Sequence, residues 1–214
     1  MSTSSRIVLA TSNKGKIAEL AEPLGALGIE VLGLADFPDL PPVEETGLTF
    51  AENALIKARA VSAATSLVAV ADDSGLCVDA LKGDPGVHSA RYSDDLEALP
   101  GESRDARNNR KLLDALRGVP EAGRTAHFSC VMAAARPDGA AIIATGRWNG
   151  RILEAPRGSN GFGYDPLLFD PTLNRTAAEL SREEKMSVSH RAQALRELLR
   201  LWPRFWEAAC RQQR

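Results

Sequence analysis

The spacing of hydrophobic and polar residues along the chain predicts an α/β fold. Apolar residues at helical spacing predict helices after Thr49, at 107–117 and from 189 to Pro203, and residues 136–139 predict a hairpin turn. Short apolar runs bounded by turn residues predict strands at 6–10, 30–34, 67–71, 76–81, 125–135, 140–148 and 167–169.

Polar residues mark the expected starts of helices, and a proline marks one expected end. Thr49 with Glu52 has the spacing of a capping box, and so does Ser181 with Glu184. Pro203 is expected to end the last helix, because proline lacks the N–H that continues it. A short aromatic tail would then follow.

The composition describes a chain able to bury a sizeable core. It has 214 residues, of which 44% are hydrophobic, and we interpret 1–214 as a single domain of two closely packed lobes without a hard boundary. The net charge of −2 gives no global reason to bind nucleic acid or a membrane surface. Three separated cysteines and the absence of a signal-peptide pattern favour a reduced, cytoplasmic setting.

Two adjacent carboxylates, Asp72 and Asp73, follow the apolar run at 67–71. Like charges this close repel each other, so a nearby cation would stabilise them. Mg²⁺, or Mn²⁺ in its place, is the natural candidate because both prefer oxygen ligands. A simpler alternative is that the acids belong to an ordinary turn with Ser74 and Gly75.

A polar loop joins the first strand to a helix and has the character of an anion site. Asn13 is placed to cap that helix. Loop amides and the helix dipole attract anions, and lysine side chains add full positive charge. The alternative is a capped helix with solvated lysines. The loop comprises Thr11, Ser12, Asn13, Lys14, Gly15 and Lys16.

A second acidic pair, Glu44 and Glu45, precedes the helix that carries Lys57. Only tertiary folding could bring these acids close to Asp73, and the sequence does not show that closeness. The alternative is that they lie where a helix N-terminus favours negative charge.

The segment 158–166 is rich in glycine and contains two aromatic residues, Phe162 and Tyr164. Glycine permits close approach of a ligand, the rings offer flat faces, and Asp165 is held extended by the proline that follows it. The alternative is a glycine-rich turn before the strand at 167–169.

Positive charge recurs beside these acidic and aromatic segments. His190 and Arg191 lie at a helix start, where a bound anion or carbonyl would offset their clash with the dipole. Carboxylates, a divalent metal and several cations suit a polyphosphate substrate, so these residues indicate a metal-dependent enzyme acting on a phosphorylated small molecule. The candidate cations are Lys16, Lys57, Lys185 and Arg191.

Taken in order, the motifs closely resemble the inosine triphosphate pyrophosphatase family, which includes the XTP/dITP diphosphatases. The match runs from about Val8 to Leu195. The resemblance implies Mg²⁺-dependent hydrolysis of noncanonical purine nucleoside triphosphates (ITP, dITP, XTP) to the monophosphate and pyrophosphate. It also implies two lobes around a long mixed sheet, a substrate cleft between the lobes and a homodimer. The matching segments are 11–16, 44–50, 52–54, 57–59, 71–75, 85–86, 89–93, 161–165, 176–179 and 189–191.

The resemblance also implies roles for individual residues. Catalysis would fall to Asp73 as general base and metal ligand, with Asp72 and Lys57, although which aspartate is the base stays open. Asp72 and one or both of Glu44 and Glu45, with Glu45 favoured over Glu44, would complete the metal site. The implied substrate contacts are residues 11–16 for the triphosphate, Ser74, Lys57 and Lys185 for phosphate or sugar, Phe162 with Gly163, Tyr164 and Asp165 for the purine ring, and His190 and Arg191 for the base edge.

Hydrogen-bond chemistry supports a purine-reading role for His190 and Arg191. Their donors would be satisfied by a 6-oxo group and left unpaired against the amino group of adenine. Rejection of GTP must then depend on the 2-position. Two alternatives stay open: a pyrophosphatase for pyrimidine or modified triphosphates, and a nucleotide-binding regulator without catalysis.

Overall fold

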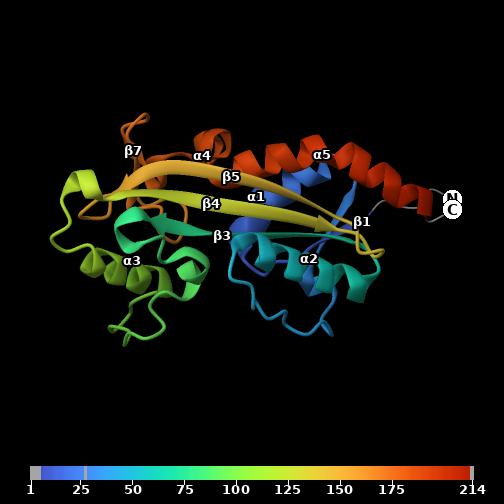
Figure 1. The fold of residues 1–214 in the computed structure, drawn as a ribbon, viewed down its shortest axis with the longest axis horizontal. Coiled ribbons are helices and arrows are strands. Elements are labelled where there is room, and N and C mark those ends of the chain that lie inside the picture. The colour runs from blue at the N-terminus through green and yellow to red at the C-terminus, as the bar shows by residue number, and fades with distance from the viewer. Residues whose placement is uncertain (1–5, 27, 213–214) are drawn as a thin grey trace. The chain divides into compact units, whose positions relative to one another are not determined.

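The computed structural model describes residues 6–26 and 28–212, without the side chains of 14, 15, 18, 19 and 208–212, and has a mixed α/β fold (Figure 1). The helices are α1 (Lys14–Gly25), α2 (Phe50–Thr65), α3 (Arg104–Ala115), α4 (Arg182–Val188) and α5 (His190–Gln212). The strands are β1 (Arg6–Leu9), β2 (Glu30–Gly33), β3 (Val68–Val78), β4 (Thr125–Ala135), β5 (Ala141–Ile152), β6 (Leu168–Asp170) and β7 (Arg175–Thr176).

The described strands form one mixed sheet in the order β2-β1-β3-β4-β5-β6-β7. β1 runs parallel to β2 and to β3, with Ile7 opposite Val31 and Val68. β6 runs antiparallel to β5 and to β7. The expectation of an α/β fold around a mixed sheet is therefore confirmed.

The chain divides into two compact units. The first comprises Met1–Asp73, Cys130–Thr145 and Gln193–Arg214, and the second comprises Ser74–Ser129 and Gly146–Ala192. Strands β3, β4 and β5 contribute residues to both units. The expected cleft between two lobes stays a prediction.

Each unit has its own hydrophobic core. In the first unit, Ala54, Ala58 and Val61 of α2 pack against small residues of the sheet such as Val8 and Ala69. Figure 1 shows α2 and α5 on opposite sides of the sheet in this unit. In the second unit the core is formed by Leu112 and Leu116 on or beside α3, Phe128, Trp148, Tyr164 and Leu168.

The predicted helix caps are present. Thr49 Oγ1 accepts the Glu52 N–H at 3.2 Å, and Glu52 Oε2 accepts the Thr49 N–H at 3.0 Å. Ser181 and Glu184 form the same pair of bonds at the start of α4. These caps were predictable because they depend on residues only three positions apart.

The predicted turn between two strands at 72–75 is wrong. β3 is a single extended strand from Val68 to Val78, and Ser74 and Gly75 lie inside it. A Cβ on Gly75 would collide with the Gly86 carbonyl and the Ser89 side chain. Ser89 Oγ accepts the Leu76 N–H at 2.9 Å. Gly75 therefore permits a close approach within the sheet, which a local pattern cannot distinguish from a turn.

The predicted end of the last helix at Pro203 is also wrong, because α5 continues to Gln212. Packing beyond the proline explains the continuation. The rings of Trp202 and Phe205 are 5.8 Å apart and both residues are buried. Arg136 Nη1 donates to the Phe205 carbonyl at 3.2 Å. The burial of these aromatic residues and the contact with Arg136 offset the hydrogen bond that Pro203 removes.

α3 begins earlier than predicted, at Arg104 rather than Arg107. Ser103 caps it by accepting the Ala106 N–H at 3.2 Å. Asp105, which precedes the helix predicted at 107–117, thus lies in the first turn of the helix.

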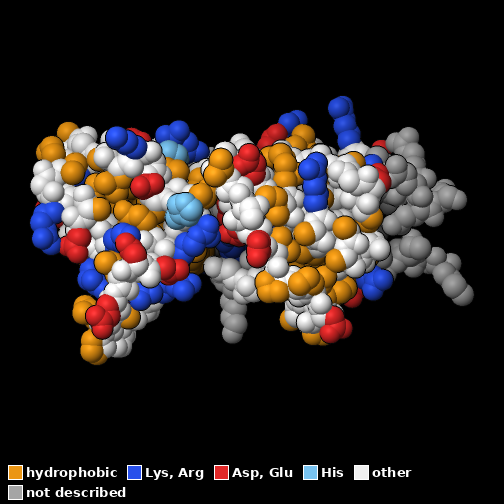
Figure 2. Space-filling view, turned by 60° about the horizontal axis from the view of Figure 1, so that its bottom comes forward, with side chains coloured by type: hydrophobic (Ala, Val, Ile, Leu, Met, Phe, Trp, Pro, Cys, Tyr) orange, Lys and Arg blue, Asp and Glu red, His pale blue; other side chains and the backbone are white. Residues whose placement is uncertain are grey.

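The surface carries mixed charge. On the face seen in Figure 2, Lys and Arg side chains are interspersed with Asp and Glu, in keeping with a net charge of −2. Within the described part of the chain, no helix is both long and apolar enough to cross a membrane.

Candidate functional site

In the first unit, Lys57 lies between two carboxylates. Its Nζ is 2.7 Å from Glu45 Oε1 and 3.3 Å from Asp73 Oδ1. Lys57 comes from α2, Asp73 from β3 and Glu45 from the loop before α2. Folding therefore brings together one member of each predicted acidic pair, which the sequence left open. Glu44, by contrast, is exposed.

Burial changes the proton affinity of this group. Loss of solvent raises the pKa of Asp73 above its usual range, although the charge of Lys57 opposes the rise. For Lys57, burial lowers the pKa, but attraction to Asp73 and Glu45 outweighs it, so the pKa lies above the ordinary value. Lys57 is thus held as a cation, and Asp73 is a stronger proton acceptor than an exposed aspartate.

Asp72 forms an ion pair with a different lysine, Lys16. Lys16 Nζ lies 2.9 Å from Asp72 Oδ2, and the Asp72 side chain is fully buried. Asp72 and Asp73 are successive residues of β3, and successive strand side chains point to opposite faces. The two pairs still sense each other, because Lys16 lowers the pKa of Asp73 and Asp72 raises that of Lys57. We call Lys16, Glu45, Lys57, Asp72 and Asp73 the carboxylate–lysine cluster.

Asn53 is a cluster neighbour to which the sequence analysis assigned no role. It is fully buried, and its Nδ2 donates to Asp73 Oδ2 at 3.2 Å. Its Oδ1 accepts the Gly47 N–H at 2.8 Å. The sequence could have identified Asn53 by its spacing from Lys57. The two residues are four positions apart on one helix and therefore share a face.

The polar loop at 11–16 caps α1, as predicted. Asn13 Oδ1 accepts the Lys16 N–H at 3.2 Å, and Thr11 Oγ1 accepts the Asn13 N–H at 3.2 Å. Ser12 and Asn13 are exposed. The side chain of Lys14 lies outside the described part, and the predicted substrate contacts of Lys14 and Gly15 stay predictions.

In the second unit, Asp165 and Lys185 form a buried ion pair. Lys185 Nζ is 2.5 Å from Asp165 Oδ2, and the two side chains are only 9% and 4% exposed. Asp165 Oδ2 also accepts the Phe162 N–H at 2.9 Å. A Cβ on Gly161 would collide with Asp165, so glycine is required where the loop closes over this pair.

Two cations lie over the Phe162 ring. Lys185 Nζ is 5.1 Å and Arg191 Cζ 5.7 Å from the ring centroid. Arg191 is 2% exposed, and its Nη2 donates to Ser74 Oγ at 3.0 Å. Folding thus brings together Ser74, Phe162, Asp165, Lys185 and Arg191, which we call the Phe162 cluster.

Tyr164 and His190, also predicted as substrate contacts, are buried beside this cluster. The Tyr164 hydroxyl donates to the Ser89 carbonyl at 2.8 Å, and burial raises the pKa of Tyr164. The His190 ring stacks on Phe128 with centroids 4.8 Å apart. Both residues make structural contacts, and their predicted contacts with substrate stay predictions.

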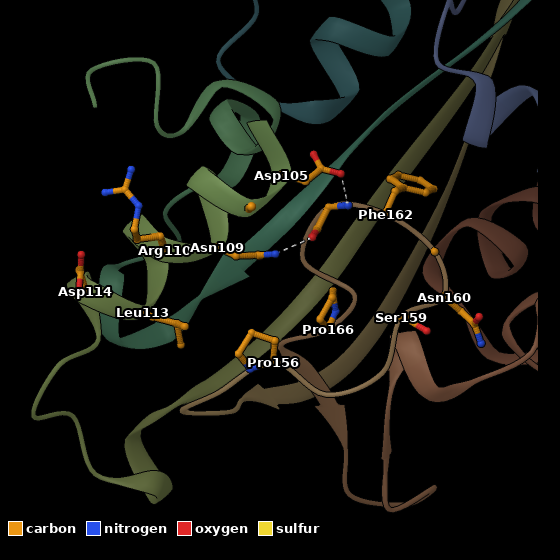
Figure 3. A pocket seen from close by; sticks show the side chains of 13 residues that line it. Asp105, Asn109, Arg110, Leu113, Asp114, Pro156, Ser159, Asn160, Phe162 and Pro166 are labelled. Atoms are coloured by element: carbon orange, nitrogen blue, oxygen red, sulfur yellow. Dashed lines mark hydrogen bonds between the residues drawn. The ribbon is translucent and has the colours of Figure 1, made fainter. Parts of the chain in front are cut away.

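A pocket of about 560 Å³ lies between α3 and the segment 156–166 (Figure 3). Asp105 and Asn109 contribute polar groups from the helix, and both hydrogen-bond the backbone of Gly163. Neither residue was among the predicted site residues. Asn109 lay on the predicted helix at 107–117, and recognising Ser103 as an N-cap would have placed Asp105 on the same helix.

No group of three or more His, Cys, Asp or Glu side chains among the described residues is close enough to hold a metal by itself. Mg²⁺ commonly binds through one or two carboxylates and completes its shell with substrate phosphates and water. The all-oxygen donors of Glu45 and Asp73 fit that chemistry.

Similarity to known proteins extends over nearly the whole chain. A model of the Ham1 family matches residues 7–201. A dITP/XTP pyrophosphatase of Nitratidesulfovibrio vulgaris is 62% identical over 204 residues, covering 95% of this chain and 99% of the relative. Another of that name, from Geobacillus kaustophilus, is 50% identical, with 92% and 93% covered.

Solved structures give the same result. A HAM1 protein from Coxiella burnetii superimposes with a TM-score of 0.82 at 44% identity, covering 92% of this chain and 98% of that one. The Ham1 protein of Staphylococcus aureus has a TM-score of 0.79 at 38% identity, with 95% and 99% covered. The resemblance inferred from the motifs is confirmed, and the chain belongs to the Ham1 family.

Proposed function

We propose that this protein hydrolyses noncanonical purine nucleoside triphosphates, dITP, XTP and ITP, to the monophosphate and pyrophosphate. The observation that carries the proposal is the 62% identity, over 95% of the chain, to a relative named dITP/XTP pyrophosphatase. The carboxylate–lysine cluster supports it, because buried acids and lysines suit a polyphosphate.

In the proposed reaction, water attacks the α-phosphorus and Asp73 accepts its proton. A P–O bond to the attacking oxygen forms, and the bond between the α-phosphorus and the bridging oxygen breaks, so pyrophosphate leaves. The raised pKa of Asp73 favours proton acceptance, and the Asn53 amide fixes the orientation of the carboxylate. Lys16 and Lys57 neutralise negative charge on the phosphate oxygens.

Mg²⁺, or Mn²⁺ in its place, would be held by Glu45 and Asp73, with Asp72 and Glu44 as further candidates. When bound, the ion would neutralise phosphate charge and polarise the reacting centre. Lys57 already bridges Glu45 and Asp73, which supports a preference for positive charge between these carboxylates. A homodimeric state and a cytoplasmic location complete the proposal.

The Phe162 cluster is the proposed base-binding part. The ring would stack on the purine, while His190 and Arg191 would supply donors for a 6-oxo group. Adenine presents an amino group there and would leave these donors unpaired, which strongly disfavours its binding. Discrimination against guanine would depend on the absence of a partner for its 2-amino group.

The test is pyrophosphate release from dITP, XTP, ITP, dGTP, dATP and dTTP, each with Mg²⁺ and with a chelator. We expect Mg²⁺-dependent cleavage of the first three at least about tenfold faster than that of the others, a factor within reach of one unpaired polar group. Faster cleavage of dTTP would favour a pyrimidine-directed enzyme. Nucleotide binding without cleavage would favour a regulator, and release of orthophosphate would contradict the proposed site of attack.

A pH measurement tests the coupling of Lys57 to Asp73. The charge of Lys57 lowers the pKa of Asp73, so Lys57→Met is expected to raise that pKa further. Because a general base works only when ionised, the acid limb of kcat/KM should move to higher pH, with a lower plateau. Arg59→Met removes an exposed cation from the same helix and should leave the limb in place. An unmoved limb in Lys57→Met would contradict the assignment of Asp73.

A further inference from the structure

The loop that carries Phe162 is tied to α3 at one residue, Gly163. The Gly163 N–H donates to Asp105 Oδ2 at 2.7 Å, and the Gly163 carbonyl accepts Asn109 Nδ2 at 3.0 Å (Figure 3). Both backbone polar groups of this glycine are therefore held by side chains one helical turn apart. Its φ of +61° is a conformation that other residues rarely adopt.

Away from Gly163, the helix and the loop are separated by the 560 Å³ pocket. Leu113 and Asp114 line it from α3, and Pro156 and Ser159 line it from the opposite side (Figure 3). A hollow space supplies little packing to hold the loop against the helix. The two hydrogen bonds to Gly163 therefore hold the loop against the helix at this point.

α3 is itself a fixed support. Asn108, adjacent to Asn109, is 2% exposed and accepts the Ser93 N–H at 2.9 Å while donating to the Ser89 carbonyl at 3.2 Å. The same carbonyl accepts the Tyr164 hydroxyl at 2.8 Å. Tyr164 follows Gly163 directly, so the helix and the loop share an anchor at Ser89.

We propose that Asp105 and Asn109 are positioning residues that set the orientation of Phe162 and thereby the strength and selectivity of purine binding. Gly163 is covalently next to Phe162, so a rotation of its peptide changes the direction of the ring. This inference rests on the proposed function, because it assigns Phe162 to the base. Neither residue belongs to the carboxylate–lysine cluster, so their effect should appear in KM and in base selectivity rather than in the chemical step.

The test compares Asp105→Ala, Asn109→Ala and the parent enzyme, with dITP and dATP as substrates. Each alanine should raise KM for dITP about fivefold, the factor expected for one lost hydrogen bond, with kcat within about twofold of the parent. The preference for dITP over dATP should fall. Asp105→Asn keeps an oxygen that can accept the Gly163 N–H. Its KM for dITP should therefore stay close to that of the parent enzyme.

Asp114→Ala is the matched control, because it removes an exposed carboxylate from the same helix and the same pocket wall without touching Gly163. It should leave KM and selectivity unchanged. Asp105 is exposed, so its alanine variant should fold even if that of the buried Asn109 does not.

Unchanged KM and selectivity in Asp105→Ala, or an equal loss in Asp105→Ala and Asp105→Asn, would overturn the positioning role while leaving the proposed function intact. A fall in kcat alone would also overturn it. A parent enzyme that cleaves none of the triphosphates would instead refute the proposed function, and the inference with it.

Discussion

Asp73→Asn is expected to lower kcat by about 10²- to 10⁴-fold, the usual contribution of a general base. The amide cannot accept the proton of the attacking water, yet it has nearly the shape of the carboxylate and retains an oxygen for Asn53. Pyrophosphate release from dITP measures the loss, and equilibrium binding of dITP shows that the substrate still binds. Normal turnover would rule out Asp73 as the base and leave Asp72 as the remaining candidate.

The same substitution should not destabilise the fold. Because burial raises the folded-state pKa of Asp73, its ionised form is disfavoured in the native state, and the resulting loss of stability appears as pH rises through that pKa. A neutral asparagine avoids this cost. We therefore compare the thermal midpoint of Asp73→Asn with that of the parent at neutral pH and at an acidic pH below the usual aspartate pKa. The difference, variant minus parent, should be larger at neutral pH.

Asp39→Asn is the control for this pH comparison, because it neutralises an exposed aspartate of the same unit. Its midpoint should follow that of the parent at both pH values. The thermal midpoint of Asp73→Asn relative to the parent could instead decrease as the pH is raised from acidic to neutral. That result would mean that Lys57 stabilises the carboxylate more than burial penalises it.

Lys185→Met is expected to lower the free energy of unfolding by about 3–5 kcal/mol, the usual cost of leaving one member of a buried ion pair alone. The uncompensated group would be Asp165, whose side chain is only 4% exposed. Denaturant unfolding gives the free energy directly. Adding Asp165→Asn should recover part of the loss, because the double variant buries no unpaired charge.

The ion pair of Arg117 and Asp114 provides the comparison. Its side chains are 82% and 54% exposed, so Arg117→Met should cost less than about 1 kcal/mol. If Lys185→Met cost no more than Arg117→Met, or if the double variant were less stable than Lys185→Met, the buried charge would not be the cause.

Local patterns predicted much of the fold. The capping boxes at Thr49 and Ser181 and the hairpin of β4 and β5 follow from residues close together in the chain, and the structure contains them. The predictions at Gly75 and Pro203 failed because each residue has two uses. Glycine serves both turns and close approaches, and proline ends a helix unless packing beyond it compensates.

The sequence by itself determined the family, the mixed α/β class and the residue types of the site, because motif identity and short-range spacing are written along the chain. Only the tertiary structure decided that Glu45 rather than Glu44 lies against Lys57, that Asp72 and Asp73 have different lysine partners, and that α3 holds Gly163. The Asp105 and Gly163 partners are 58 positions apart in sequence. Contacts of that kind depend on how the sheet and helices pack, and no local pattern encodes them.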